Sequence, residues 1–262
     1  PVDLVTILDG AFAELSAARA NGNGRRGTWA GRRDVLTVLL GDDPQAIADA
    51  LLTALRSGAT AVDVASVVSG AAALRIARFP TSNEFSDWDT ALHSFTFANA
   101  VEQGLRRAPS AELLRGVFDA AMSVYLDRFL NVPAIRLPVP EGDTAPDALL
   151  TELPALLDRQ QQVNEAAHLV ARYLRVGDPD ALLAALGHCL LREDGDFHTI
   201  QMVEAAFRQH ERLGPSEDGA HVLVAAARYL AAHAPTARAQ EQTFGIALRL
   251  HRGERLYEDV TY

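Results

Sequence analysis

Apolar residues recur at three- and four-residue spacing along most of the chain, which is the period of an amphipathic α-helix. The pattern opens over 2–20, where Val5, Leu8, Phe12 and Leu15 fall on one side of a helix. Short polar, glycine- or proline-containing breaks separate the helical stretches and supply caps for the next one. They predict a short helix ending near 40 and further helices over 43–57, 60–79, 87–107, 110–131, 147–158, 160–176, 179–193, 196–213, 217–234 and 236–252. No pair of strands is indicated, so we predict an all-α protein, a bundle of roughly ten to twelve helices.

One segment, 132–146, breaks this helical pattern because it carries prolines at 133, 138, 140 and 146. Proline lacks a backbone donor and disrupts a helix interior, so we interpret this segment as a connector. It would join an N-terminal helical half, 1–131, to a C-terminal helical half, 147–262, within one compact unit. The sequence Asp87-Trp88-Asp89-Thr90 resembles Asp196-Phe197-His198-Thr199, and each opens a long helix. Two related halves are therefore one interpretation, and generic helix capping is the other.

Charge and composition exclude several classes of function. The 262 residues include 34 acidic and 24 basic ones, all of the latter arginine, for a net charge of −10. The arginines are dispersed rather than gathered on one basic surface, so we expect no nucleic-acid partner. The lack of lysine removes Schiff-base catalysis and the lysine of a phosphate loop. No stretch reaches ~18 apolar residues without a charge, so we expect no membrane span.

The ends of the chain and its single cysteine limit the picture further. No basic patch precedes an apolar core at the N-terminus, so the expected location is cytoplasmic. Cys189 lies in an apolar run and is interpreted as a small buried side chain. One cysteine provides no disulfide framework, no thiolate zinc site and no iron–sulfur cluster on this chain. The alanine-rich helices allow close packing, either within one subunit or between copies in a homo-oligomer.

Histidines are the remaining candidates for chemistry, because imidazole is the commonest neutral metal ligand and general acid or base. His93 comes first, since apolar residues surround it and its helix is expected to be buried on most faces. A buried helix must satisfy its polar groups, and a polar pocket or a metal would do so, with Asp89 as a further ligand. The alternative is a core histidine hydrogen-bonded to a neighbouring helix.

Two more histidines lie near breaks between helices. His233 falls on an apolar face one turn before Pro235, where the helix dipole also favours it. His198 follows an acidic loop, 193–196, whose aspartates either cap the helix or assist a metal. Asp194 is the loop residue that we name as a further ligand or a supporting group.

A fourth candidate, His168, follows Glu165 in a Glu-x-x-His spacing that places both groups on one helix face. Ferritin-like di-iron bundles use two such motifs and two further glutamates, whereas this chain has one copy. A solvated, ion-paired face explains the spacing equally well. The other four histidines, at 188, 210, 221 and 251, are interpreted as structural.

Several short segments of the sequence are similar to those of a known group of proteins. They are Ala71-Ala72-Ala73-Leu74-Arg75-Ile76-Ala77-Arg78-Phe79, Asn83-Glu84-Phe85-Ser86-Asp87-Trp88-Asp89-Thr90, Tyr125-Leu126-Asp127-Arg128-Phe129-Leu130-Asn131, and the segments 191–199 and 248–254. The chain resembles, from Asp43 onward, the helical region of actinobacterial proteins labelled as Rieske [2Fe–2S] proteins. It is also similar, more weakly, to histidine-rich helical oxidases of the questin-oxidase type.

These resemblances imply redox chemistry, with one departure. A Rieske cluster needs two cysteines and two histidines, so the single cysteine places any such cluster elsewhere. The resemblance then implies a [2Fe–2S] electron donor on another segment or another protein. The questin-oxidase resemblance implies mononuclear non-haem iron held mainly by imidazoles. In such relatives histidine stands where this chain has Pro80 and Leu92.

Two hypotheses of different classes follow. The first is a metal-dependent oxidoreductase acting on a small organic substrate beside Trp88, Phe95 and Phe97, with iron favoured and zinc as the alternative. Its ligands would come from His93, His168, His198 and His233, assisted by Asp89, Glu165 or Asp194. The second is a metal-free helical scaffold or ligand-binding domain that docks a redox partner. Convergence of the histidines in space would favour the first hypothesis, and their dispersal would contradict it.

Overall fold

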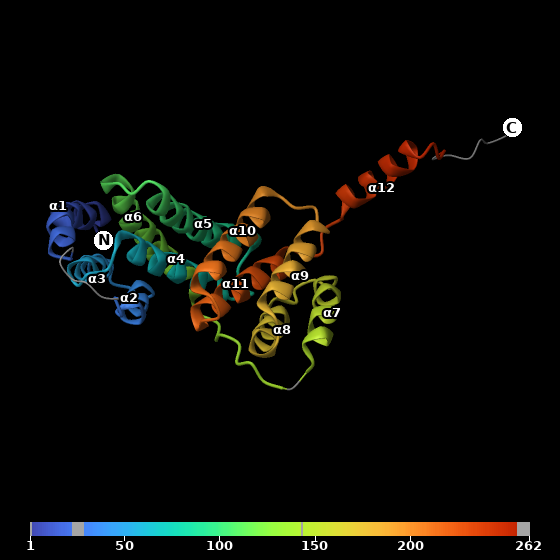
Figure 1. Cartoon of the computed structure of the whole chain (residues 1–262), viewed down its shortest axis with the longest axis horizontal. Coiled ribbons are helices and arrows are strands. Elements are labelled where there is room, and N and C mark those ends of the chain that lie inside the picture. Colours follow the sequence, from blue (N-terminus) through green and yellow to red (C-terminus); the bar gives the residue numbers. More distant parts are fainter. Residues whose placement is uncertain (1, 23–28, 143, 256–262) are drawn as a thin grey trace.

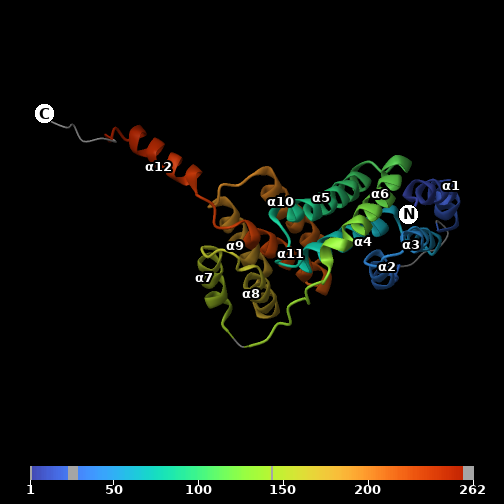
Figure 2. The ribbon, with the colours of Figure 1, turned by 180° about the vertical axis from the view of Figure 1, so that it is seen from behind.

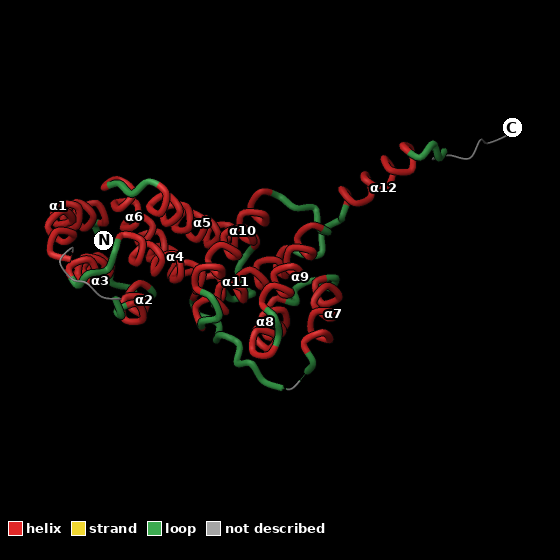
Figure 3. The backbone as a smooth tube through the Cα atoms, viewed as in Figure 1, coloured by secondary structure: helices red, strands yellow, loops and turns green. Residues whose placement is uncertain are grey.

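The computed structural model describes residues 2–22, 29–142 and 144–255, and within these ranges it contains helices and loops but no strand (Figure 3). The predicted all-α bundle of ten to twelve helices is confirmed. The helices are α1 (Leu4–Gly22), α2 (Arg32–Leu39), α3 (Pro44–Arg56), α4 (Ala61–Ala77), α5 (Phe85–Arg107), α6 (Ala111–Leu126), α7 (Pro146–Leu157), α8 (Val163–Val176), α9 (Pro179–Leu191), α10 (Phe197–Leu213), α11 (Glu217–His233) and α12 (Ala239–His251). A 3₁₀ helix, Asp127–Asn131, continues α6.

Helix α4 lies at the centre of the part of the molecule formed by α1 to α6 (Figure 1). Every residue from Val64 to Ala77 is buried. Most of these residues are alanine, valine, serine or glycine, whose small side chains let neighbouring helices approach closely. Helices α2, α5, α6 and α11 pack against α4. A helix without a polar face is expected to be enclosed on all sides, and α4 is enclosed in this way.

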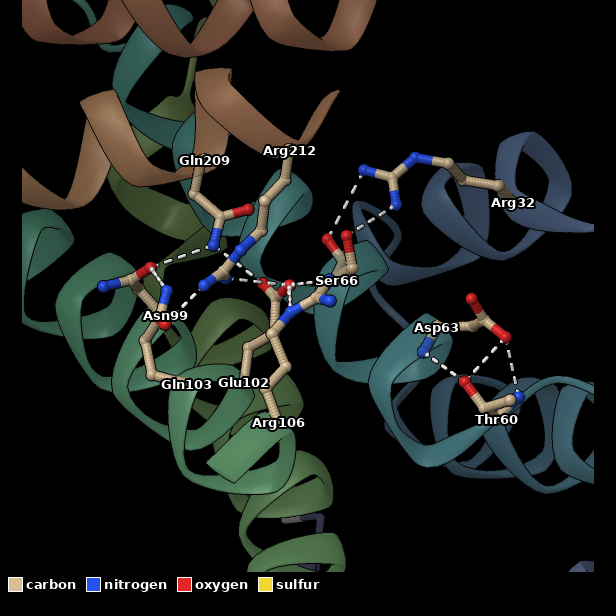
Figure 4. Close-up of polar contacts among 10 residues, drawn as sticks. All are labelled: Arg32, Thr60, Asp63, Ser66, Asn99, Glu102, Gln103, Arg106, Gln209 and Arg212. Atoms are coloured by element: carbon tan, nitrogen blue, oxygen red, sulfur yellow. Dashed lines mark hydrogen bonds and ion pairs between the residues drawn. The ribbon is translucent and has the colours of Figure 1, made fainter. Parts of the chain in front are cut away.

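Local capping chemistry explains where several helices begin. Thr60 and Asp63 form a reciprocal capping box at the start of α4 (Figure 4). Asp43 accepts two backbone N–H groups ahead of Pro44, which occupies the first turn of α3. Asp196 caps α10 in the same manner. These starts are the ones that the sequence predicts.

Helix α11 joins the helices on the two sides of the proline-rich segment. It packs against α8 and α10, which follow that segment, and against α4, which precedes it. Helix α10 likewise packs against α5. The described residues between 132 and 145 contain no helix, as the prolines predict. The division into two halves stays a prediction.

Helix α12 projects away from the rest of the protein (Figures 1 and 2). None of its described side chains is buried, and Phe244 and Leu250 are 67% and 54% exposed. It begins at Ala239 rather than at the predicted 236 because Arg238 adopts a left-handed backbone conformation at its N-cap. Among the described helices, none combines the length and the apolar character needed to cross a lipid bilayer.

Candidate functional site

Three of the four candidate histidines lie together where α5, α10 and α11 pack. The rings of His93 on α5 and His198 on α10 have centroids 5.1 Å apart. His233, at the end of α11, is close enough to His198 for the charge of His198 to lower the pKa of His233. We call this group, with the three other polar residues described below, the histidine cluster: His93, His198, His233, Asp89, Asp196 and Tyr229.

Asp89 links α5 to α11 through a short hydrogen bond. The hydroxyl of Tyr229 donates to Asp89 Oδ1 at 2.6 Å, and the same oxygen lies 3.8 Å from His233 Nε2. The rings of Tyr229 and His233 stack with centroids 4.0 Å apart, since four residues separate them on one helix. Burial, followed by the hydrogen bond to Asp89, raises the pKa of Tyr229. Tyr229 is therefore a protonated donor at neutral pH.

The tautomer of His233 follows from its hydrogen bond. Its Nδ1 lies 2.7 Å from the carbonyl oxygen of Tyr229, which can only accept, so Nδ1 carries a proton. Burial lowers the pKa of His233, and the Tyr229 carbonyl and the charges of Asp89 and Asp196 offset this effect only in part. The ring is accordingly neutral near pH 7, with a lone pair on Nε2. That buried Nε2 has no hydrogen-bond partner, and the His233 side chain is 7% exposed.

A second carboxylate, that of Asp196, lies on the α10 side of the cluster. Its Oδ1 accepts the backbone N–H of Thr199 at 2.9 Å, and its Oδ2 lies 3.8 Å from His198 Nδ1. Burial acts to raise the pKa of Asp196, but the Thr199 hydrogen bonds and the charges of His198 and His233 outweigh it, so the pKa is lowered. The cluster thus holds an ionised carboxylate beside two imidazoles.

Exposed aromatic rings border the cluster on both sides. Phe85 is 59% exposed, and the centroids of its ring and of the His233 ring are 4.3 Å apart in an edge-to-face arrangement. Phe197 is 62% exposed and its ring lies 3.8 Å from that of His198. Large apolar side chains at the surface are informative when they gather around polar groups, as they do here.

The environment predicted for His93 is wrong, because its side chain is exposed. The buried face of α5 is set by positions such as Trp88, Leu92, Phe95 and Asn99, and His93 is turned about 100° away from Leu92. A count of apolar neighbours along the helix did not reveal which of its faces would be covered.

Two other groups of candidates lie outside the histidine cluster. Glu165 and His168 are both exposed on α8, as a solvated helix face predicts, and α8 carries none of the cluster residues. Asp194 accepts the backbone N–H groups of Ala239 and Gln240, both at 2.8 Å. It therefore caps α12, whereas the helix that carries His198 is capped by Asp196, as the capping interpretation of the acidic loop predicts.

The cluster does not form a ready-made metal site. Nowhere in the described ranges do three or more histidine, cysteine, aspartate or glutamate side chains lie where they could hold one metal ion. Zinc and iron ligands must converge to within about 2.0–2.2 Å of a common centre. The side chains as placed do not fit such a centre, even though one buried imidazole nitrogen lacks a partner.

A further polar network, on the C-terminal part of α5, joins that helix to α10 (Figure 4). Glu102 is completely buried and accepts hydrogen bonds from Arg106, Gln209 and Arg212, the last two on α10. Gln209 also donates to Asn99 at 2.9 Å. The Glu102 carboxylate therefore has three donors and joins α5 to α10, whereas the buried Oε1 of Gln209 has no hydrogen-bond partner.

The sequence did not single out Tyr229 as a member of the site. Its spacing of four residues from His233 was the available signal, because that spacing places both rings on one helix face. Its partner Asp89 lies 140 residues away, and no local pattern reports such a contact. Comparison with protein-family models, with curated proteins and with solved structures found no match for this chain.

Proposed function

We propose that the chain is a helical ligand-binding domain whose histidine cluster takes the cationic group of a small organic molecule. One observation carries the proposal: the buried Nε2 of neutral His233 offers an unused lone pair beside the carboxylate of Asp89. A buried polar atom without a partner costs free energy, so a ligand that donates to it is favoured. The metal-free hypothesis drawn from the sequence is the one that this geometry supports.

The charges of the cluster favour a cation over an anion. Asp89 and Asp196 supply negative charge, and neither forms an ion pair with an arginine within the described ranges. The histidines are the basic groups at hand, and His233 is neutral at pH 7. The exposed rings of Phe85 and Phe197 add faces on which a cation is attracted by the ring quadrupole.

A metal-dependent oxidoreductase remains a second candidate, favoured by the tautomer of His233. Metal-binding histidines commonly donate the other ring N–H to a backbone carbonyl, as His233 does to Tyr229. Binding would require the exposed His93 and the half-buried His198 to rotate toward His233. Iron, the small organic substrate and the [2Fe–2S] partner all belong to this candidate.

Calorimetric titration at pH 7.5 separates the two candidates. The probes are butylammonium, which has N–H donors, for the organic cation, and Zn²⁺ and anaerobic Fe²⁺ for the metal. We expect saturable binding of an ammonium ion that Asp89→Asn and His233→Phe each weaken about tenfold. Asp119→Asn, which removes the same charge from an exposed position on α6, should leave binding within about twofold.

Each result assigns the site differently. Ammonium binding that is equal in Asp89→Asn and Asp119→Asn would contradict the proposal, and so would the absence of ammonium binding. Stoichiometric metal binding lost in both His93→Ala and His233→Phe, with helicity retained, would establish the second candidate. His168→Ala is the control for that measurement, since His168 is exposed on α8 and outside the cluster.

A further inference from the structure

A cleft lined by three arginines lies at the end of α4, away from the histidine cluster. Its volume is about 510 Å³, which falls in the range of small-molecule sites. Arg75, Arg78 and Arg128 contribute the charges, and Asn131 contributes an amide. Leu40, Leu74, Phe129 and Val132 contribute apolar surface. A second cavity of about 370 Å³ adjoins it, and the two share Arg78, Leu40 and Leu74 as walls.

Two of these arginines are fixed in place by the fold. Arg75 is buried and donates to the carbonyl oxygens of Val124 and Leu40, both at 3.2 Å. Arg128 donates to the Tyr125 carbonyl at 3.0 Å, and its guanidinium carbon lies 3.9 Å from the centre of the Tyr125 ring. Since both guanidinium groups are held by the backbone, their charge is available to a ligand without reorganisation.

Arg78 differs because its side chain has no partner. No hydrogen bond or ion pair reaches its guanidinium from any described residue, and its buried Nε is unsatisfied. The backbone N–H of Ile135 donates to the Arg78 carbonyl at 2.9 Å, which fixes the residue in the wall of the cleft. The buried Nε of Arg172, Arg192 and Arg228 also lacks a hydrogen-bond partner, but each of those guanidinium groups forms other hydrogen bonds. The guanidinium of Arg78 forms none with the described residues, and an anionic acceptor would complete it.

Asn131, in the same cleft, has an unpaired acceptor where Arg78 has an unpaired donor. Its amide nitrogen donates to the Arg75 carbonyl at 2.9 Å, which fixes the orientation of the amide. Its buried Oδ1 has no partner, and the residue is 6% exposed. A ligand that fits both residues must offer an acceptor to Arg78 and a donor to Asn131.

The acidic residues around the cleft do not cancel its charge. Asp42 is the acidic residue among those that line the larger cavity. The charge of Asp127 opposes the lowering of the Arg75 pKa by burial. Asp218 forms an ion pair with Arg32 in the adjoining cavity. The end of α4 accounts in part for two of the arginines, because cations are favoured at a helix C-terminus. It does not account for Arg128, which belongs to the 3₁₀ helix, or for the unpaired acceptor of Asn131.

We propose that this arginine cleft binds an organic anion in which a carboxylate or phosphate lies next to a hydrogen-bond donor and is attached to an apolar body. A 2-hydroxy carboxylate has this arrangement, and so does a monoprotonated phosphate ester. The anion would lie against Arg78 with Arg75 and Arg128 behind it, and the donor would face Asn131 Oδ1. The apolar body would cover Phe129 and Val132, which are 65% and 75% exposed.

Calorimetric titration in a chloride buffer with hexanoate, 2-hydroxyhexanoate and hexyl phosphate tests the proposal. We expect one saturable site for 2-hydroxyhexanoate or hexyl phosphate, and weaker binding of hexanoate because it lacks the donor. The tighter of the two ligands identifies the class of anion. Arg78→Gln should weaken this binding about tenfold. Arg107→Gln removes the same charge from an exposed position on α5 and should change it less than about twofold.

The melting temperature of Arg78→Gln and one further variant, Asn131→Asp, distinguish ligand binding from a purely structural role of Arg78. Arg78 holds nothing in the fold through its side chain, so Arg78→Gln should keep the wild-type melting temperature. Asn131→Asp adds a negative charge beside the anion and should abolish binding. Equal affinities of the Arg78→Gln and Arg107→Gln variants would overturn the proposal. So would a failure of every probe to bind, or loss of the folded state in Arg78→Gln.

Discussion

The imidazole of His233 is neutral, buried and bonded through one nitrogen only, which links its protonation to the stability of the protein. Its ordinary pKa of 6.5 applies to the unfolded chain, and burial lowers that pKa in the folded chain. Below pH 6.5 the unfolded state therefore binds a proton that the folded state does not bind. The contribution of His233 to stability is complete above pH 6.5 and is lost as the pH falls below that value.

We expect the free energy of unfolding to fall more steeply below pH 6.5 in the wild type than in His233→Phe. Phenylalanine keeps the ring contacts with Tyr229 and Phe85 but cannot take up a proton. One proton sets an upper limit of about 1.4 kcal/mol per pH unit for the difference in slope. Urea unfolding between pH 7.5 and pH 5 measures it.

The exposed His168 provides the control for this pH series. His168→Gln should follow the wild-type curve, because this side chain is exposed on α8 and lies outside the histidine cluster. Parallel curves for the wild type and His233→Phe would show that burial of His233 has no energetic consequence.

Helix α12 depends on a few polar contacts at its first turn rather than on packing. Asp194 caps it, and Arg238 forms ion pairs with Glu193 and Asp158 just before it begins. The side chain of Glu193 is 5% exposed, and that of Asp158 is 45% exposed. Isolated helices shorter than about 12–15 residues are marginal in water, so these contacts determine whether α12 persists.

Asp194→Ala should therefore loosen α12 without affecting the helices of the core. Loss of an N-cap costs about 1 kcal/mol, which is about a fivefold change in the local opening equilibrium. Hydrogen exchange resolved by peptide measures the change, with peptides from α11 as the internal reference. Equal acceleration in α11 and α12 would mean that Asp194 supports the whole fold rather than one helix.

The sequence predicts the helices well because their starts are local chemistry. Thr60, Asp43 and Asp196 each bond to backbone groups within three residues, so a short stretch of sequence contains all the required information. The start of α12 was misplaced because Arg238 is held by Asp158 and Glu193, which lie 80 and 45 residues away. Contacts at that separation leave no mark on the local pattern.

Across the molecule, Arg228 on α11 is one of the buried contacts between the parts of the chain that precede and follow the proline-rich segment. It donates to the carbonyl oxygen of Phe79 at 2.6 Å and to Asn164 on α8 at 2.8 Å. Burial lowers the pKa of its guanidinium to about 10, so it remains charged at neutral pH. A charged side chain that is 1% exposed is retained only where its hydrogen bonds compensate for desolvation.

Arg228→Met should lower the free energy of unfolding by about 1–3 kcal/mol, because it leaves the buried Phe79 carbonyl without a donor. The chain has two tryptophans, Trp29 and Trp88, both before the proline-rich segment. Tryptophan fluorescence thus reports on the surroundings of these two rings, of which Trp88 also faces Tyr229 on α11, whereas circular dichroism reports on all helices. We expect both signals to give one coincident transition, shifted equally by the substitution. Separate transitions would show that the two halves unfold independently.

The candidate site was predicted only in part, for reasons of tertiary packing. The sequence places four histidines on four helices, and the period of each helix indicates a face but not its neighbour. Three of these helices meet and bring His93, His198 and His233 together, whereas α8 leaves His168 exposed. The arginine cleft was missed because Arg78 and Arg128 are 50 residues apart and each looks like an ordinary surface charge in the sequence.

The loop between α9 and α10 connects the projecting helix to the histidine cluster over very few residues. Glu193 and Asp194 hold the base of α12, and Asp196 and His198 belong to the cluster. Helix α12 is about 20 Å long at 1.5 Å per residue. A tilt of about 10° at the first turn of α12 would move the far end of the helix by about 3.5 Å. A small tilt at the loop that holds the first turn of α12 would therefore displace the far end of that helix by several ångströms.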